Sequence, residues 1–118
     1  MLTRTIPFHL KTTKNSLLRN LHYIVIAKDY PNGLEKRLAA RPAHLERTKQ
    51  SKATGKVLMG GATFNDQSEM NGSIMLMDAA SADEIEAYLV EDPYVKGSVW
   101  KSWEIIPFKL AGISPYLK

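Results

Sequence analysis

The sequence predicts a single α+β domain with the element order strand, helix, strand, strand, helix, strand, which is the split βαβ arrangement. Three observations predict it: β-rich segments alternate with two helix-start patterns, a polar loop separates the middle strands, and 118 residues leave room for one domain. Because crossovers in such units are right-handed, both helices are expected on one face of a four-stranded antiparallel sheet.

The first strand is predicted from the alternation of its side chains, and the first helix from a capping box at its start. Residues 21–27 are apolar on both faces of an extended chain, so both faces of this strand are expected to be covered. Asn32 and Glu35 have the spacing of a capping box that opens a helix over residues 34–53, bent near Pro42. The buried stripe of this helix is expected to consist of Leu34, Leu38 and Leu45.

The middle of the chain predicts a hairpin and a second helix. Residues 56–64 and 72–78 are rich in β-forming residues and flank the polar loop 65–71. Ser81 and Glu84 form a second capping box, which starts the second helix. Its inward-facing residues are expected to be Ile85, Leu89 and Tyr88, and the strand methionines Met59, Met75 and Met77 are expected to fill the core or an interface.

The last strand follows a short capped turn. Asp92 has the side chain of a helix cap, Pro93 fits a first helical position, and Gly97 ends the turn. β-branched and aromatic residues then predict a strand over residues 98–106. Pro107 cannot donate to a strand ladder, so the strand is expected to stop there.

Charge and composition limit the classes of function. Residues 1–20 carry four basic residues and no acidic one, whereas residues 21–118 contain 12 of each, so the net charge of +4 belongs to the first segment. A neutral body is a poor candidate for nucleic-acid binding. No apolar run is long enough to span a membrane. The absence of cysteine excludes disulfides and thiolate chemistry, and the three histidines lack metal-motif spacing, so neither a metal nor a cofactor is expected.

The chain divides into a basic extension, a domain and a short tail. These are expected to span residues 1–20, 21–110 and 111–118. The extension contains serine and threonine but no acid, a composition typical of a mitochondrial transit peptide, although Pro7 interrupts any helix across it. The plainer alternative is an unstructured tail on a cytoplasmic protein.

The sheet face without helices is expected to bind a second copy of the chain. With both helices on one face, the other face would expose apolar side chains of several strands to water in a monomer. A contiguous apolar patch of this kind usually marks an interface. The sequence therefore predicts a homodimer that forms through the sheet faces, with further assembly left open.

Three segments resemble the YciI-like family. The first is Asp-Pro-Tyr at residues 92–94, followed by a glycine and an aromatic-rich strand that closes on Pro-Phe-Lys at residues 107–109. The second is the helical stretch 37–45 with its histidine, and the third is Gly-Gly-Ala at residues 60–62. The resemblance extends over residues 21–109 and implies a dimeric α/β barrel built from ferredoxin-like protomers.

The resemblance also implies a catalytic pair, which falls on His44 and Asp92. An imidazole titrates near neutrality and can take or give a proton, and a nearby carboxylate would hold it in one tautomer. The plainer alternative is a half-exposed surface histidine and an aspartate that only caps a turn. The sequence does not show the distance between the two side chains.

Four further residues are candidates for binding a substrate: Tyr94, Arg41, Gly61 and Trp100. Tyr94 offers a hydroxyl, and Gly61 follows another glycine, which permits close approach of a ligand. Arg41 lies one helical turn from Arg37, and the pair could reach an anionic substrate, although solvated surface is the plainer interpretation of both. Trp100 and Trp103 are three positions apart, so they are expected on opposite sheet faces.

The leading functional hypothesis is a cofactor-independent lyase or isomerase that uses His44 and Asp92 on a small molecule in a homodimer cleft. Some members of the family resemble dehydrochlorinases of aromatic metabolites, but fold alone does not choose among reactions. The alternative is a non-catalytic module that binds a small metabolite or serves in an assembly. RNA binding by the sheet is disfavoured because the body is neutral and has no aromatic RNA-binding motif.

Overall fold

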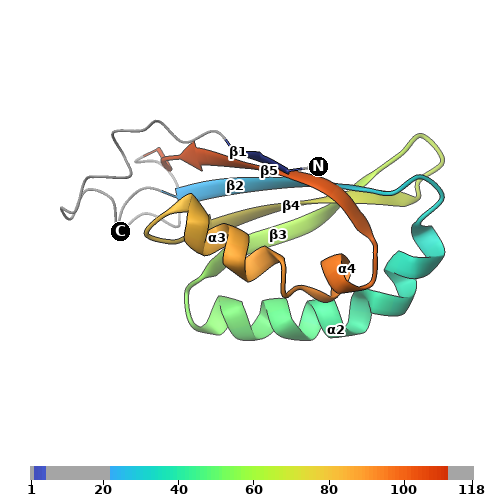
Figure 1. Ribbon diagram of the computed structural model, residues 1–118, viewed down its shortest axis with the longest axis horizontal. Helices are drawn as coiled ribbons and strands as arrows, with labels where there is room; N and C mark the ends of the chain where they lie inside the picture. The colour runs from blue at the N-terminus through green and yellow to red at the C-terminus, as the bar shows by residue number, and fades with distance from the viewer. Residues whose placement is uncertain (1, 5–21, 112–118) are drawn as a thin grey trace.

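The computed structural model describes residues 2–4 and 22–111 of the chain. One sheet is covered on one face by helices (Figure 1). Its strands are β1 (Leu2–Arg4), β2 (His22–Asp29), β3 (Val57–Phe64), β4 (Met70–Asp78) and β5 (Trp100–Phe108). Its helices are α2 (Leu34–Ala53), α3 (Ala82–Leu89) and the single turn α4 (Pro93–Lys96). No helix in these ranges is long and apolar enough to cross a membrane.

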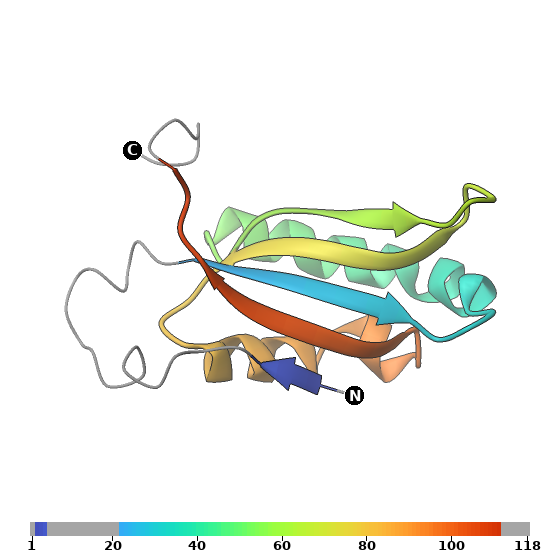
Figure 2. The ribbon, with the colours of Figure 1, turned by 90° about the horizontal axis from the view of Figure 1, so that it is seen from above.

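The strand order β5-β2-β4-β3 confirms the predicted four-stranded antiparallel, ferredoxin-like sheet. Figure 2 shows α2 behind β3 and β4, and α3 with α4 behind β5. β1 adds a short fifth strand, parallel to the outer edge of β5, which the sequence did not predict. The rest of the predicted extension, residues 1 and 5–20, lies outside the described residues, as does most of the tail, 112–118.

The core lies between the sheet and the helices. Alternate residues of β2 and β4 point toward the helices and are buried, among them Val25, Met75 and Met77, so the predicted core role of the latter two methionines is confirmed. Ile85 and Leu89 of α3 pack onto this layer as predicted. The Ser81 hydroxyl accepts from the Glu84 N–H and caps the helix, which also confirms the N-terminus of α3.

The predicted end of the last strand at Pro107 is wrong, because β5 continues to Phe108 and Pro107 pairs with Tyr23 of β2. β1 pairs only with the part of β5 from Trp103 to Ile105. Beyond that part, no described strand lies along the outer edge of β5. A proline is tolerated at such an edge, since a missing N–H there removes no ladder bond.

The predicted buried stripe of α2 is also wrong. Leu38 and Leu45 are 52% and 46% exposed, whereas Arg37 and His44 are buried on the inner side of the helix. The helix has the predicted bounds and carries Pro42 in its interior. Its inner side meets the end of the sheet and α4, where polar side chains find charged and hydrogen-bonding partners, so polarity does not indicate exposure here.

The predicted capping box of α2 does not form. The N-cap is Gly33, and no side chain caps the helix at that position. Asn32 adopts a left-handed backbone conformation with φ of 57°, one residue ahead of the N-cap. The spacing of Asn32 and Glu35 therefore predicted the correct region for the start of the helix, but it placed the N-cap one residue too early.

Trp100 and Trp103 lie on the same sheet face, so the prediction of opposite faces is wrong. Asp29 pairs with Trp100 and Lys28 pairs with Ser102, which makes Lys101 an extra residue on β5. A β-bulge of this kind resets the alternation of side chains. The two indole rings accordingly lie 6.4 Å apart, and the Trp103 indole N–H donates to a Glu86 carboxylate oxygen of α3 at 2.9 Å.

The sheet face opposite the helices is apolar and partly exposed. Ile74 of β4 is 45% exposed, and Met59 and Phe108 are also exposed. A hollow of about 470 Å³ on this face is lined mainly by apolar side chains of β2, β3, β4 and the end of β5. Nothing among the described residues covers this hollow.

The backbone and side chains around Gly72 pack too closely for a larger residue near the end of the sheet. A Cβ at this position would lie 2.6 Å from the Ala27 carbonyl oxygen and 2.7 Å from the Thr63 hydroxyl. We expect Gly72→Ala to lower the free energy of unfolding by about 1–3 kcal/mol in denaturant titrations, because backbone must move. Gly61→Ala is the matched control, since its Cβ would meet nothing within 4 Å. Equal stability of the two variants would contradict this packing.

Candidate functional site

His44 and Asp92 are bonded to each other although they are far apart in the sequence. Nδ1 of His44 lies 2.8 Å from Oδ1 of Asp92, and both residues are buried. α2 presents His44 inward just after Pro42, and the cap of α4 fixes Asp92, whose Oδ1 also accepts from the Tyr94 N–H at 2.9 Å. The same aspartate therefore serves as a helix cap and as the partner of the histidine.

Arg47 completes the surroundings of the Asp92 carboxylate. Its Nη1 donates to Oδ2 of Asp92 at 3.0 Å, and its Nη2 donates to the Tyr88 carbonyl oxygen at 2.6 Å. Its guanidinium also lies over the Tyr88 ring, 3.8 Å from the ring centre. Sequence analysis missed Arg47, although its position one turn after His44 on α2 places both side chains on the same helix face.

The hydrogen bond to Asp92 determines which nitrogen of His44 is available. A carboxylate can only accept, so Nδ1 carries the hydrogen of that bond. In the neutral ring the lone pair then lies on Nε2. His44 lines a small cleft of about 170 Å³ between α2, β3, β4 and α4, and Nε2 is the ring nitrogen that Asp92 does not occupy.

Tyr94 is packed between His44 and Arg37. The His44 and Tyr94 rings stack with centres 3.9 Å apart and planes inclined by 14°. The Arg37 guanidinium lies over the Tyr94 ring at 4.5 Å, and it must occupy the opposite ring face because the imidazole fills the first. Burial raises the pKa of the Tyr94 phenol above 10.0, while the charges of Arg37 and Arg41 oppose this shift. The phenol therefore keeps its proton near neutral pH.

Arg37 is buried, so its interpretation as solvated surface is wrong. Nη1 binds both carboxylate oxygens of Asp29 at 3.2 and 3.3 Å, and Nη2 donates to the Gly72 carbonyl oxygen at 2.9 Å and to the Ser73 hydroxyl at 2.6 Å. These bonds attach α2 to β2 and β4. Burial raises the pKa of Asp29 above its ordinary value even though Arg37 opposes the shift.

The cleft brings together most of the residues selected from the sequence. His44, Arg41, Gly61 and Tyr94 all line it, and Arg41 is exposed. Asp92 lies behind His44. Trp100 is not among the lining residues, and its ring instead packs edge-on against His44 with centres 5.8 Å apart. The lining side chains also include Arg37, whose charge is paired with Asp29, and no carboxylate.

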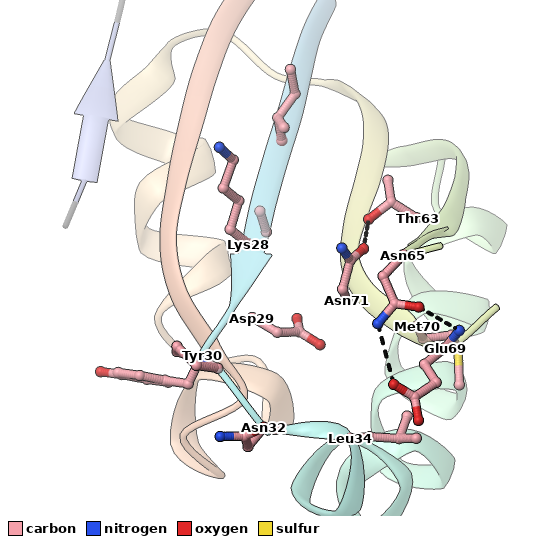
Figure 3. A pocket seen from close by; sticks show the side chains of 14 residues that line it. Lys28, Asp29, Tyr30, Asn32, Leu34, Thr63, Asn65, Glu69, Met70 and Asn71 are labelled. Carbon is pink, nitrogen blue, oxygen red and sulfur yellow. Dashed lines mark hydrogen bonds between the residues drawn. The ribbon is translucent and has the colours of Figure 1, made fainter. Parts of the chain in front are cut away.

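A larger hollow of about 530 Å³ lies beside the β3–β4 hairpin (Figure 3). Its polar side chains largely bond to one another: Thr63 donates to the Asn71 side chain at 2.8 Å, and Asn65 donates to Glu69 at 3.2 Å. Asp29 points into this hollow, yet its carboxylate is held by Arg37. Neither His44 nor Asp92 lines it, so the bonded His44–Asp92 pair is separate from this hollow.

Among residues 2–4 and 22–111, no group of three or more histidine, aspartate or glutamate side chains is placed to hold a metal ion.

The tautomer of His44 can be measured directly. In 15N-resolved NMR spectra at a pH where the ring is neutral, we expect the His44 proton on Nδ1 in the wild type, because Asp92 accepts from that atom. Asp92→Ala should remove this preference. His22 is an internal control, since its Nδ1 is buried without a hydrogen-bond partner in the described part of the chain. A wild-type His44 with its proton on Nε2 would contradict the described bond.

Comparison with known proteins identifies relatives in bacteria. An uncharacterized protein of Haemophilus influenzae is 33% identical over 95 residues, which cover 75% of this chain and 97% of the relative. Protein YciI of Escherichia coli is 33% identical over 93 residues, which cover 74% and 95%. Among solved structures, 5-chloro-2-hydroxyhydroquinone dehydrochlorinase (TftG) of Burkholderia phenoliruptrix, in complex with 2,5-dihydroxybenzoquinone, is 28% identical with a TM-score of 0.68 and coverage of 76% and 95%.

These relatives overturn the expected mitochondrial location. The Haemophilus and Escherichia proteins come from organisms without mitochondria, yet this chain matches nearly their whole length. The basic, acid-free composition of residues 1–20 was therefore a misleading signal, because a short segment can have that composition for other reasons. The alternative expectation, a cytoplasmic location, fits the bacterial relatives.

The residues that match the family cover the folded domain. The profile of the YCII-related domain matches residues 21–109, a range that contains β2 to β5 and the whole cleft. His44 and Asp92 both lie inside this range. The chain belongs to the YCII-related, or YciI-like, domain family.

Proposed function

We propose that the chain is a small-molecule enzyme of the lyase or isomerase type, in which His44 transfers a proton and Asp92 orients it. The observation that supports this most directly is the 2.8 Å bond between Nδ1 of His44 and Asp92, which leaves Nε2 as the basic atom in the cleft. A general base positioned in this way typically contributes a factor of about 10²–10⁴ in rate.

The proposed substrate is a small oxygenated ring with acidic hydroxyl groups. The cleft is lined by Arg41 and by no carboxylate, and the charge of Arg37 is paired with Asp29, so Arg41 favours an oxygen that carries negative charge. Its small volume favours a compound of about one ring. The 28% identical dehydrochlorinase binds 2,5-dihydroxybenzoquinone, a ring of this kind, and supports the same class for this chain.

Each residue selected from the sequence has a proposed role. Tyr94 offers its protonated phenol to the substrate, and Arg41 attracts a negatively charged oxygen at the mouth of the cleft. Gly61 leaves the wall at β3 without a side chain. Trp100 fixes the His44 ring by edge contact and does not bind substrate.

The proposed reaction begins at Nε2 of His44. This atom takes a proton from a ring hydroxyl, and the resulting imidazolium is stabilised by the Asp92 carboxylate. The electron pair of the broken O–H bond remains on the substrate, where Arg41 stabilises it. His44 can then return the proton to a ring carbon, which gives isomerisation. Where that carbon carries a halogen, Nε2 next takes the proton of a second ring hydroxyl, and the electron pair of that O–H bond forms a carbonyl. The ring double bond shifts toward the protonated carbon, and the halide leaves it with its bonding electrons, so that one proton and one halide are lost in all.

The proposal can be tested with 5-chloro-2-hydroxyhydroquinone, the substrate in the name of the similar enzyme. We expect chloride release by the wild type and a loss of about 10²–10⁴-fold in His44→Gln with the fold intact. Lys49→Gln, on the exposed side of the same helix, is the control and should keep full activity.

The alternative hypothesis predicts a different result. If the wild type binds 2,5-dihydroxybenzoquinone but converts neither this compound nor halogenated or hydroxylated rings, and His44→Gln binds it equally well, the chain is a non-catalytic binding module. Equal turnover by the wild type and by His44→Gln would contradict the assigned role of the histidine.

A second copy of the chain is the proposed partner of the open sheet face. Ile74, Met59 and Phe108 are exposed on this face around an apolar hollow, and a contiguous exposed apolar patch usually marks an interface. An isologous homodimer would bury the same patch on both copies.

Ile74→Lys should convert the dimer into a monomer in analytical ultracentrifugation, because each interface would bury two unpaired ammonium groups. Leu38→Lys is the matched control, since Leu38 is exposed on the outer side of α2 and the dimer should persist. A wild-type monomer, or an Ile74→Lys dimer, would contradict the proposed interface.

A further inference from the structure

Ser73 contributes a buried hydroxyl group to the same cleft. It lies on β4, its side chain points toward the helices, and it is 3% exposed while lining the cleft with His44 and Tyr94. Its Oγ receives two hydrogen bonds, from Nη2 of Arg37 at 2.6 Å and from Nε1 of Trp100 at 3.3 Å. Sequence analysis did not select this serine, because a single serine in a strand carries no motif.

The two bonds determine what the hydroxyl can still do. A guanidinium and an indole N–H are donors only, so the Ser73 oxygen must accept in both bonds. A hydroxyl oxygen has two lone pairs and one hydrogen, so both lone pairs are occupied and the O–H remains as a donor. The adjacent Arg37 cation draws electron density from the oxygen and strengthens that donor.

We propose that Ser73 donates a hydrogen bond to an oxygen of the bound substrate, and that Arg37 and Trp100 are positioning residues that aim this donor. The inference rests on the proposed function, because the substrate oxygen is the one that becomes negative when His44 removes a proton. A donor fixed before the reaction stabilises that charge without reorganising. The cleft thereby carries a base and a hydrogen-bond donor among the side chains that line one small volume.

A purely structural role for Ser73 predicts different behaviour. If the hydroxyl only linked Arg37 to Trp100, its removal would lower stability and alter every property of the cleft to a similar degree. If the hydroxyl instead donates to the ligand, it weakens the C=O bond of the ligand oxygen that accepts the hydrogen bond. The carbonyl stretching vibration of a bound quinone reports this directly, since donation to the oxygen lowers its frequency.

The test uses 2,5-dihydroxybenzoquinone as the probe with the full chain, by equilibrium titration and infrared difference spectroscopy. We expect Ser73→Ala to weaken binding about tenfold to a hundredfold and to shift a carbonyl band of the bound probe to higher frequency. Ser73→Cys should shift the same band, because a thiol is a weak donor. If Ser73→Ala does not fold, the carbonyl band is measured in Ser73→Cys instead. Ser102→Ala, outside the cleft on β5, should match the wild type.

The outcomes separate this inference from the proposed function. A probe that binds the wild type with an unchanged band in folded Ser73→Ala or Ser73→Cys overturns the role of Ser73 and leaves the proposed function standing. A probe that does not bind the wild type overturns the proposed substrate class and this inference together. Weakened binding with the band shift supports both.

Discussion

The buried Asp92 carboxylate is the constraint on which the site depends. A fully buried charge is strongly disfavoured unless donors surround it, and here the His44 ring, the Arg47 guanidinium and the Tyr94 N–H all approach its two oxygens. Two of these donors belong to α2 and the third to α4. The carboxylate can be buried only when both helices occupy their observed places, so formation of the site and docking of the helices are one event.

A second buried charge, Arg37, acts on the same helix two turns before His44. It bonds to Asp29 and to the Gly72 carbonyl and Ser73 hydroxyl of β4, and its flat face lies on Tyr94. The two charged clusters therefore meet at the Tyr94 ring. This arrangement explains why the inner side of α2 is polar: its side chains form the site and attach the helix, while the apolar core is filled by the strands and α3.

The sequence predicted the fold well because its strongest signals are local. The bounds of α2, the Ser81 cap and the Asp92-Pro93 start of α4 all depend on neighbouring residues. Leu38 and Leu45 misled the analysis because helix periodicity assumes that apolar residues face inward, and nothing local shows that Arg37 and His44 find buried partners. The positions of the tryptophans depended on one extra residue, Lys101, in the strand ladder, which composition does not show.

The candidate pair was found by resemblance, but its supporting residues were not. Arg47 and Ser73 have no pattern of their own, and their importance follows only from the atoms that surround them in the folded chain. Trp100 was selected as a contact for substrate and instead packs against the histidine. Residues that line a cleft and residues that hold its walls are alike in sequence, because both are buried or half-buried polar and aromatic side chains.

The attachment of α2 through directional bonds has a consequence for variation in the chain. A helix that packs on an apolar surface can slide or rotate slightly when a neighbouring side chain changes size. Here Arg37 and His44, two turns apart on α2, both make ion pairs or hydrogen bonds, and such directional contacts permit only one position of the helix on the sheet. Asp29 is the last residue of β2 and does not line the cleft, yet its carboxylate helps to fix the position of α2 through its bonds to Arg37. The geometry of the imidazole is thus partly encoded at a strand end that a ligand in the cleft does not touch.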